Sequence, residues 1–105
     1  MSWIYLLLAG LTEIGWPLGM KIAQTSSVRW PGILMAIAFM AISGMFLWLA
    51  QKQIPIGTAY AVWTGIGAAG TFLVGVLFFG DPGSAMRYFG ILMIISGVVV
   101  LKLAH

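Results

Sequence analysis

The sequence predicts an all-α membrane protein with four membrane-spanning helices. Hydrophobic residues make up 62% of the 105-residue chain, and charged residues make up only 7%. A soluble domain carries about 25% charged residues, so lipid must surround most of this chain. Charged and turn residues divide it into four apolar runs of about 20 residues, the length of helix that crosses a bilayer core. The runs are too long for strands and lack their alternation.

The four spans form one domain and are expected at residues 3–21, 31–51, 55–79 and 85–102. Lys21 closes the first span, and a polar loop follows at residues 24–29. Pro31 and Pro55 open the second and third spans, because proline is tolerated in the first turn of a helix. A Gly-Asp-Pro-Gly-Ser turn at residues 80–84 precedes the fourth. The loops are short, so neighbouring helices must run antiparallel.

The basic residues are divided almost evenly between the two membrane faces. Lys52 and Lys102 fall on the side of the N-terminus, whereas Lys21, Arg29 and Arg87 fall on the other. Because the bias of Lys and Arg sets orientation, this balance predicts a chain that inserts either way up. The alternative is that the difference of one charge, the lipid or the translocon still fixes one orientation.

The composition excludes several classes of chemistry. The chain has no cysteine, and its single histidine is the last residue, His105. Disulfides, thiolate metal sites and cysteine nucleophiles are therefore excluded. No nucleophile–base pair or metal cluster is visible, so we expect neither an enzyme nor a bound metal or cofactor. The basic residues are scattered, without the clustered patch typical of nucleic-acid-binding proteins.

Glu13 lies near the middle of the first span. An ionisable residue at that depth costs roughly 2.5–3.5 kcal/mol or more and marks a functional site by default. The alternative is a protonated glutamate that only packs against a neighbouring helix. No Lys or Arg lies deep in any span to pair with it. A carboxyl group that binds either a proton or a cation couples their opposite movements, as a proton-coupled cation exporter requires.

A single chain is too small to work alone as a transporter. Four helices that fill their own core cannot also enclose an aqueous site. Transporters commonly combine two halves of opposite topology around a site at the midplane. An inverted second copy would place its Glu13 at the same depth, so we expect an antiparallel homodimer in the bilayer whose two carboxylates share one site.

Three residues near Glu13 on the first span have distinct expected roles. Gly10, three residues before it, leaves room beside the carboxylate. Trp16, three residues after it, offers an indole N–H and a π face for a cation, or else serves as an interfacial anchor. Pro17 has no N–H to bond the carbonyl of residue 13, so we expect a local kink.

The second and third spans contribute further candidates. Ser43 is the main buried hydroxyl expected in the second span. Tyr60 and Trp63 lie three residues apart in the third, and both can donate hydrogen bonds that orient a carboxylate, although isolated aromatics more often serve packing. Gly65 and Gly67 favour a hinge, with close helix packing as the alternative.

Small residues line one face of the fourth span. Gly90 and Gly97 lie seven residues apart, and Ser96 is adjacent to the second. A narrow stripe of small residues suits contact between membrane helices. We expect dimerisation through this stripe rather than a transport path along it.

The whole chain resembles the small multidrug resistance family. The resemblance rests on four short spans in 105 residues, on the lone Glu13, and on the stretch Pro-Ile-Gly-Thr-Ala-Tyr-Ala-Val-Trp-Thr-Gly-Ile-Gly at residues 55–67. It implies an antiparallel homodimer of the bacterial inner membrane that exchanges protons for cations by alternating access. Gly90 and Gly97 match the glycine heptad through which the fourth helices of that family dimerise.

Within the family, the chain is similar to the guanidinium exporter branch. Trp16 beside the glutamate, Thr64 after Trp63, and the Leu-Lys pair at residues 101–102 carry that similarity. The branch implies that Glu13 binds the proton and the substrate, that Gly10 lines the site, and that a hydrogen-bond network is formed by Trp16, Ser43, Tyr60 and Trp63. Planar guanidinium matches a carboxylate through two parallel hydrogen bonds.

Two other functions remain as alternatives. One is export of quaternary ammonium or other lipophilic cations by the same mechanism. The other is a membrane assembly subunit that transports nothing, which would have no need of a titratable group such as Glu13 in mid-membrane.

Overall fold

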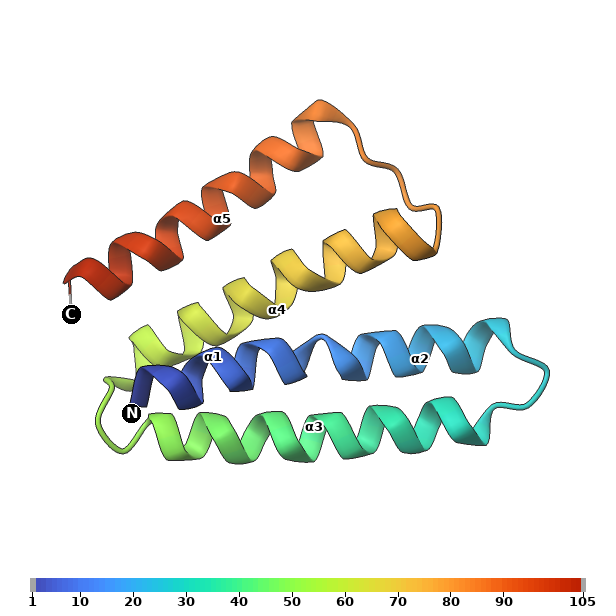
Figure 1. Cartoon of the computed structure of the whole chain (residues 1–105), viewed down its shortest axis with the longest axis horizontal. Helices are drawn as coiled ribbons and strands as arrows, with labels where there is room; N and C mark the ends of the chain where they lie inside the picture. Colours follow the sequence, from blue (N-terminus) through green and yellow to red (C-terminus); the bar gives the residue numbers. More distant parts are fainter. Residues whose placement is uncertain (1, 105) are drawn as a thin grey trace.

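The computed structural model describes residues 2–104, so Met1 and the single histidine, His105, lie outside it. Five helices follow one another along the chain (Figure 1): α1 Ser2–Glu13, α2 Gly15–Thr25, α3 Trp30–Ala50, α4 Ile56–Phe78 and α5 Ala85–Ala104. Taken together, α1 and α2 form one apolar rod, so four segments are long and apolar enough to span a membrane. The predicted all-α architecture with four spans is confirmed.

The first span is longer than predicted. Helix α2 continues past Lys21 to Thr25, and the loop therefore begins at Ser26 rather than Gln24. Lys21 is exposed near the end of the span, where a long lysine side chain can keep its ammonium in the interface while its stem stays in lipid. A charged residue at such a position does not have to end a helix.

The first span is interrupted at Ile14, beside Glu13. The Ile14 N–H donates to the carbonyl of Leu11, three residues back, at 3.3 Å, and regular bonding resumes where the Leu18 N–H meets the Ile14 carbonyl at 3.3 Å. Pro17 supplies no N–H for the carbonyl of residue 13, which breaks the ladder of hydrogen bonds at this turn. The helix is thus broken at the position where a kink was predicted, and the break places the carboxylate at the end of α1.

Glycines bring α2 and α3 into close contact. A Cβ atom on Gly19 would lie 2.7 Å from the carbonyl oxygen of Gly32, and one on Gly32 would lie 2.6 Å from the backbone nitrogen of Ala23. Such close approach is available only to residues without a side chain. The α2–α3 pair is therefore held together by backbone-to-backbone packing.

The buried core lies at the end of the molecule that holds the N-terminus. It consists of Leu6 from α1, Ala50 and Ile54 around the α3–α4 turn, and Ala59 and Val62 from α4. The Ser2 hydroxyl also donates to the side-chain oxygen of Gln53 at 2.7 Å. These contacts fix the start of α1 against the turn that leads into α4.

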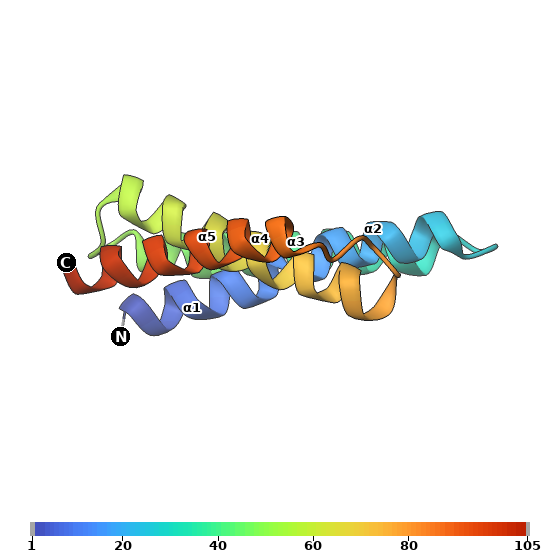
Figure 2. The ribbon, with the colours of Figure 1, turned by 90° about the horizontal axis from the view of Figure 1, so that it is seen from above.

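Helix α5 stands apart from the rest. Its backbone closely approaches that of α4 alone, none of its described residues is buried, and Figure 1 shows it leaning along the outer edge of the molecule. Viewed from above, the helices form a flat layer (Figure 2), about 17 Å thin in its shortest dimension. The expectation of four helices around a filled core is therefore wrong: lipid can cover an apolar α5, so nothing forces it inward.

Replacing Gly32 with alanine should separate α2 from α3 and lower stability by roughly 1–3 kcal/mol, because the added Cβ overlaps the backbone of α2. Thermal unfolding in detergent measures the effect. The matched control is Gly44→Ala on the same helix, where the Cβ points into open space. Equal melting temperatures for the two variants would contradict this packing.

Candidate functional site

A chain of three polar side chains links α4, α3 and α1. The Trp63 indole N–H donates to the Ser43 hydroxyl oxygen at 2.8 Å. The Ser43 hydroxyl lies 3.1 Å from Oε1 of Glu13 and 2.8 Å from the carbonyl oxygen of Ala9, both of which can accept its proton. Ser43 is completely buried, as predicted. The structure therefore joins Trp63, Ser43 and Glu13 in one network.

The Ser43 hydroxyl has a choice of acceptors. A hydroxyl carries one proton and can accept two hydrogen bonds. Its oxygen accepts from Trp63, and its single proton serves either the Glu13 carboxylate or the Ala9 carbonyl. In the second arrangement the Ser43 oxygen is free to accept a hydrogen bond from a neutral Glu13. The same three side chains thus satisfy both protonation states of the glutamate.

Tyr60 and Trp16 lie outside this network in the single chain. The Tyr60 ring meets Trp63 edge to face, with centroids 5.5 Å apart, and is 56% exposed. Neither the Tyr60 hydroxyl nor the Trp16 indole forms a hydrogen bond within residues 2–104. For Trp16 the reason is local: the break at Ile14 lies between it and Glu13, so ideal helical spacing does not hold there.

Two glycines shape the space around Glu13. A Cβ on Gly67 would lie 2.7 Å from Cγ of Glu13, so the glutamate rests directly on the backbone of α4. A Cβ on Gly10 would lie 2.6 Å from Cβ of Ile66, so the space expected beside the carboxylate is filled by close packing of α1 on α4. Both glycines are buried.

The glycines proposed as a hinge are also packing residues. Gly65 faces α5, and a Cβ there would lie 2.7 Å from Cγ2 of Val98. Gly67 faces Glu13, as described above, and α4 is continuous from Ile56 to Phe78 through both positions. Gly90 and Gly97 on α5 have no atom within 4 Å of a built Cβ in the described chain.

Glu13 opens onto a hollow of about 270 Å³. Its lining comes from the first span and from α4: Glu13, Pro17, Thr64, Gly67, Ala68 and Thr71. Neither Ala68 nor Thr71 was among the site residues predicted from the sequence. The signal that could have found them is helical spacing, because they follow Thr64 by four and seven residues and so lie on the same face.

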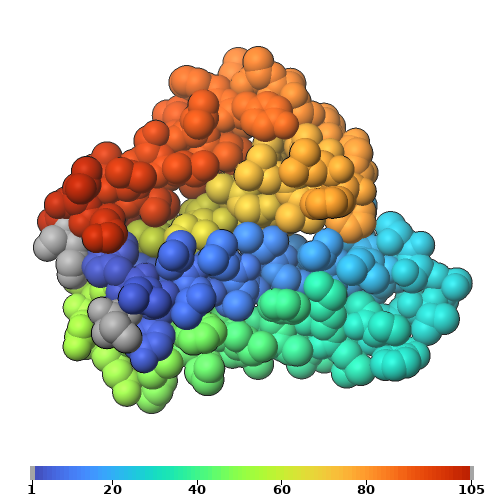
Figure 3. Space-filling model, viewed as in Figure 1, coloured from blue at the N-terminus to red at the C-terminus, as the bar shows by residue number. Residues whose placement is uncertain are grey.

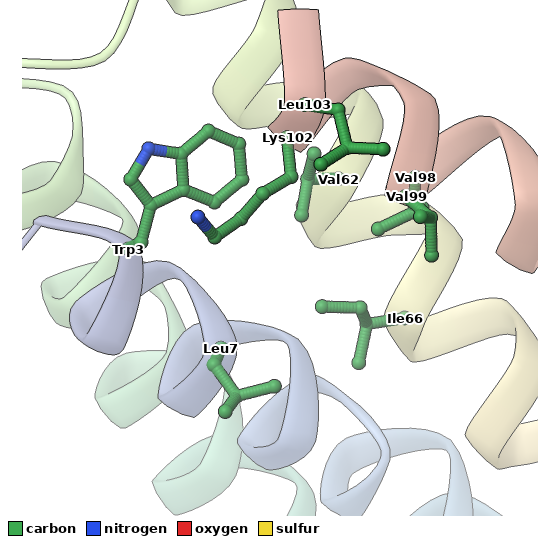
Figure 4. A pocket seen from close by; sticks show the side chains of 8 residues that line it. All are labelled: Trp3, Leu7, Val62, Ile66, Val98, Val99, Lys102 and Leu103. Atoms are coloured by element: carbon green, nitrogen blue, oxygen red, sulfur yellow. The ribbon is translucent and has the colours of Figure 1, made fainter. Parts of the chain in front are cut away.

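A second hollow of about 250 Å³ lies between α1, α4 and α5 (Figure 4). It is lined by Trp3, Leu7, Val62, Ile66, Val98, Val99, Lys102 and Leu103. Lys102 is the one charged residue in this lining, and its ammonium lies 5.2 Å from the centre of the Trp3 ring. With no carboxylate in its walls, this hollow cannot exchange a proton for a cation.

Comparison with known proteins decides the family. Residues 1–94 match the sequence profile described as "Small Multidrug Resistance protein". The chain belongs to the small multidrug resistance family. It is therefore a transporter-family protein of the bacterial inner membrane and not an enzyme, and the resemblance inferred from its residues is confirmed. Within residues 2–104, no cluster of side chains suits a metal ion.

Several curated relatives match along their whole length. The "Guanidinium exporter" of Yersinia pseudotuberculosis is 44% identical over 104 residues, which cover 99% of both chains. The "Guanidinium exporter" of Salmonella typhimurium is also 44% identical, over 99% of this chain and 98% of its own. The Escherichia coli protein of the same name is 39% identical over the same shares.

Gly67→Ala should displace the Glu13 side chain and break its contact with Ser43, a hydrogen bond worth roughly 1.5–3 kcal/mol when the carboxylate is charged. Glu13 is the only glutamate in the chain, so glutamate labelled with ¹³C at the carboxyl gives one resonance to follow by NMR. That resonance should move in Gly67→Ala and stay in place in the control Gly57→Ala, where a Cβ meets nothing. An unmoved resonance in both would refute the contact.

Proposed function

We propose that this protein is a proton-coupled antiporter that exports guanidinium and small guanidinyl cations. The observation that carries the proposal is Glu13, a carboxylate in mid-span that is held by the Ser43–Trp63 pair and open to a hollow. The names of its full-length relatives support guanidinium as the substrate class. No cofactor enters this mechanism.

Substrate recognition follows from the chemistry of the carboxylate. Ser43 donates to Oε1 of Glu13, and the remaining lone pairs face guanidinium, a planar cation with paired N–H donors and no acceptor. The Trp63 N–H fixes the Ser43 oxygen, so the acceptor geometry is set before the substrate arrives. Quaternary ammonium compounds have no N–H, so they would gain the attraction between opposite charges but not the paired hydrogen bonds.

Exchange follows from the two satisfied states of the network. The charged glutamate binds the cation while Ser43 donates to it. The neutral glutamate donates to Ser43, whose proton turns to the Ala9 carbonyl. Because neither state leaves a buried group unpaired, a proton can replace the cation at little cost in hydrogen bonding. Competition for one carboxylate then couples the two movements.

We propose that the working unit is an antiparallel homodimer. The flat shape of the single chain and the open lining of Glu13 support this, since a second, inverted copy would close the hollow and add its own carboxylate. In this arrangement the unpaired donors of Trp16 and Tyr60 reach the substrate or the opposite glutamate. Gly90 and Gly97, which face open space, form the contact between the two α5 helices.

We place the hinge for alternating access at Gly65 and Gly67. Glycines lower the stiffness of a helix. One of this pair rests against Glu13 and the other against α5, so bending between them would move the site relative to the dimer contact. Gly10 stays in the lining as the position where α1 packs on α4.

Transport is tested in proteoliposomes by recording currents on addition of guanidinium and then of tetramethylammonium. Guanidinium should give the larger current, and Glu13→Gln should abolish it, because the amide binds neither a proton nor a cation at that position. Gly57→Ala, remote from the network, is the control. Guanidinium currents that persist unchanged in Glu13→Gln would overturn the mechanism. A larger tetramethylammonium current would favour a quaternary ammonium exporter, and no current with either would favour an assembly subunit.

Orientation is tested with a single cysteine at position 52. The chain has no natural cysteine, so Lys52→Cys gives one reactive site at an exposed turn. An impermeant maleimide applied to sealed cells should label about half of the chains, and permeabilisation should expose the rest. Labelling confined to one side would contradict dual insertion.

A further inference from the structure

The hollow at Glu13 adjoins a third hollow, which extends toward the loop after α4. This third hollow, of about 170 Å³, lies between α2 and the C-terminal half of α4, and it shares Pro17 and Thr71 with the hollow at Glu13. Figures 1 and 3 show α2 beside this end of α4. Lys21 and Asp81 line its outer part. The two hollows together extend from Glu13, past the shared Pro17 and Thr71, to Lys21 and Asp81, and we refer to them as the groove.

Asp81 is the only acidic side chain in the chain besides Glu13. The loop after α4 holds it in place: its N–H donates to the Gly75 carbonyl at 3.0 Å, and its carboxylate lies against the position that a Cβ on Gly75 would occupy. Asp81 forms no ion pair with Lys21 in the part of the chain that the structure describes. The two charges face the same groove separately.

Thr71 lies where the two hollows meet, and its hydroxyl is uncommitted. Thr12 and Thr64, in the same two spans, donate to carbonyls of their own helices at 2.7 and 2.8 Å. Within residues 2–104, the Thr71 hydroxyl makes no such bond. Guanidinium carries only donors, so it needs acceptors along its path. The groove offers them in sequence at Asp81, Thr71 and Glu13.

We propose that Asp81 and Thr71 form an outer station for the transported cation. Asp81 attracts the cation at the membrane surface, Thr71 accepts a hydrogen bond from it on the way, and Glu13 receives it. Lys21 opposes capture by repelling the same cation. The inference rests on the proposed guanidinium transport, and in the antiparallel dimer it places one such mouth on each face of the membrane.

The test measures initial rates of guanidinium transport in liposomes of zwitterionic lipid, as a function of concentration, at low and at high ionic strength. Asp81→Asn should raise KM about threefold at low salt, with a much smaller change in the maximal rate, and Lys21→Gln should lower KM by a similar factor. High salt should remove both differences, because the charges lie at the surface. Asp81→Glu should restore the low KM.

The matched control is Arg29→Gln. It removes a positive charge from the same membrane face, but Arg29 belongs to the α2–α3 loop and does not line the groove. The KM of Arg29→Gln should equal that of the unsubstituted protein within experimental error. An Asp81→Asn protein whose KM is unchanged at low salt, or whose raised KM persists in high salt, would overturn the outer station and leave a structural role for Asp81 in the turn.

A second pair of variants tests Thr71. Thr71→Val removes the hydroxyl at nearly constant volume and should slow transport about fivefold at subsaturating guanidinium, while Thr71→Ser should restore it. Equal rates in the valine and serine variants would refute the role of the hydroxyl. Failure of the proposed transport function would be seen separately. The unsubstituted protein would then give no guanidinium current, or the guanidinium current would persist in Glu13→Gln.

Discussion

The structure depends on the hydrogen bonds that hold one carboxylate inside an apolar span. An acidic side chain at this depth has no water to solvate it, so the neighbouring helices must supply its partners. Ser43 does so from α3, and Trp63 fixes Ser43 from α4. The three helices must therefore meet at one height for the network to close, and this requirement sets their register.

Glycines make that meeting possible. Gly10 allows α1 to approach Ile66, and Gly67 allows Glu13 to lie on the backbone of α4. Gly19 and Gly32 bring α2 and α3 together further along. Membrane helices gain little from burying apolar surface against one another, so close packing has to provide the attraction. Of these glycines, Gly10 and Gly67 lie where the helices of the polar network meet.

The sequence was sufficient for the spans, the kink and the central carboxylate, because each follows from local chemistry. The length of an apolar run identifies a membrane span, and Pro17 removes one hydrogen bond from the helix. A lone glutamate in mid-membrane is energetically costly and so indicates a functional site. The pairing of Ser43 with both Glu13 and Ala9 could not be predicted, since it depends on how three helices dock. Helical spacing could place Thr71 on the face of Thr64, but not beside both hollows, because these form only when α2 docks near α4.

The detached position of α5 shows the limit of such prediction. An apolar helix has the same kind of sequence whether it faces protein or lipid. The sequence of α5 therefore could not predict where the helix packs. Gly65, predicted as part of a hinge, also provides the surface on which Val98 of α5 packs. A glycine in a membrane helix permits both bending and close contact, and only the neighbouring helix distinguishes the two.

The break at Ile14 gives the first span a mechanical property. α1 is fixed at one end by the core around Leu6, and α2 is fixed at the other by Gly19 against Gly32. Two anchored rods with a weakened joint concentrate any change of tilt at that joint, and Glu13 lies immediately beside it. Glu13 therefore lies close to the pivot of any bending between α1 and α2. A small rotation of α2 relative to α1 would change which groups surround the carboxylate but would move the carboxylate itself very little.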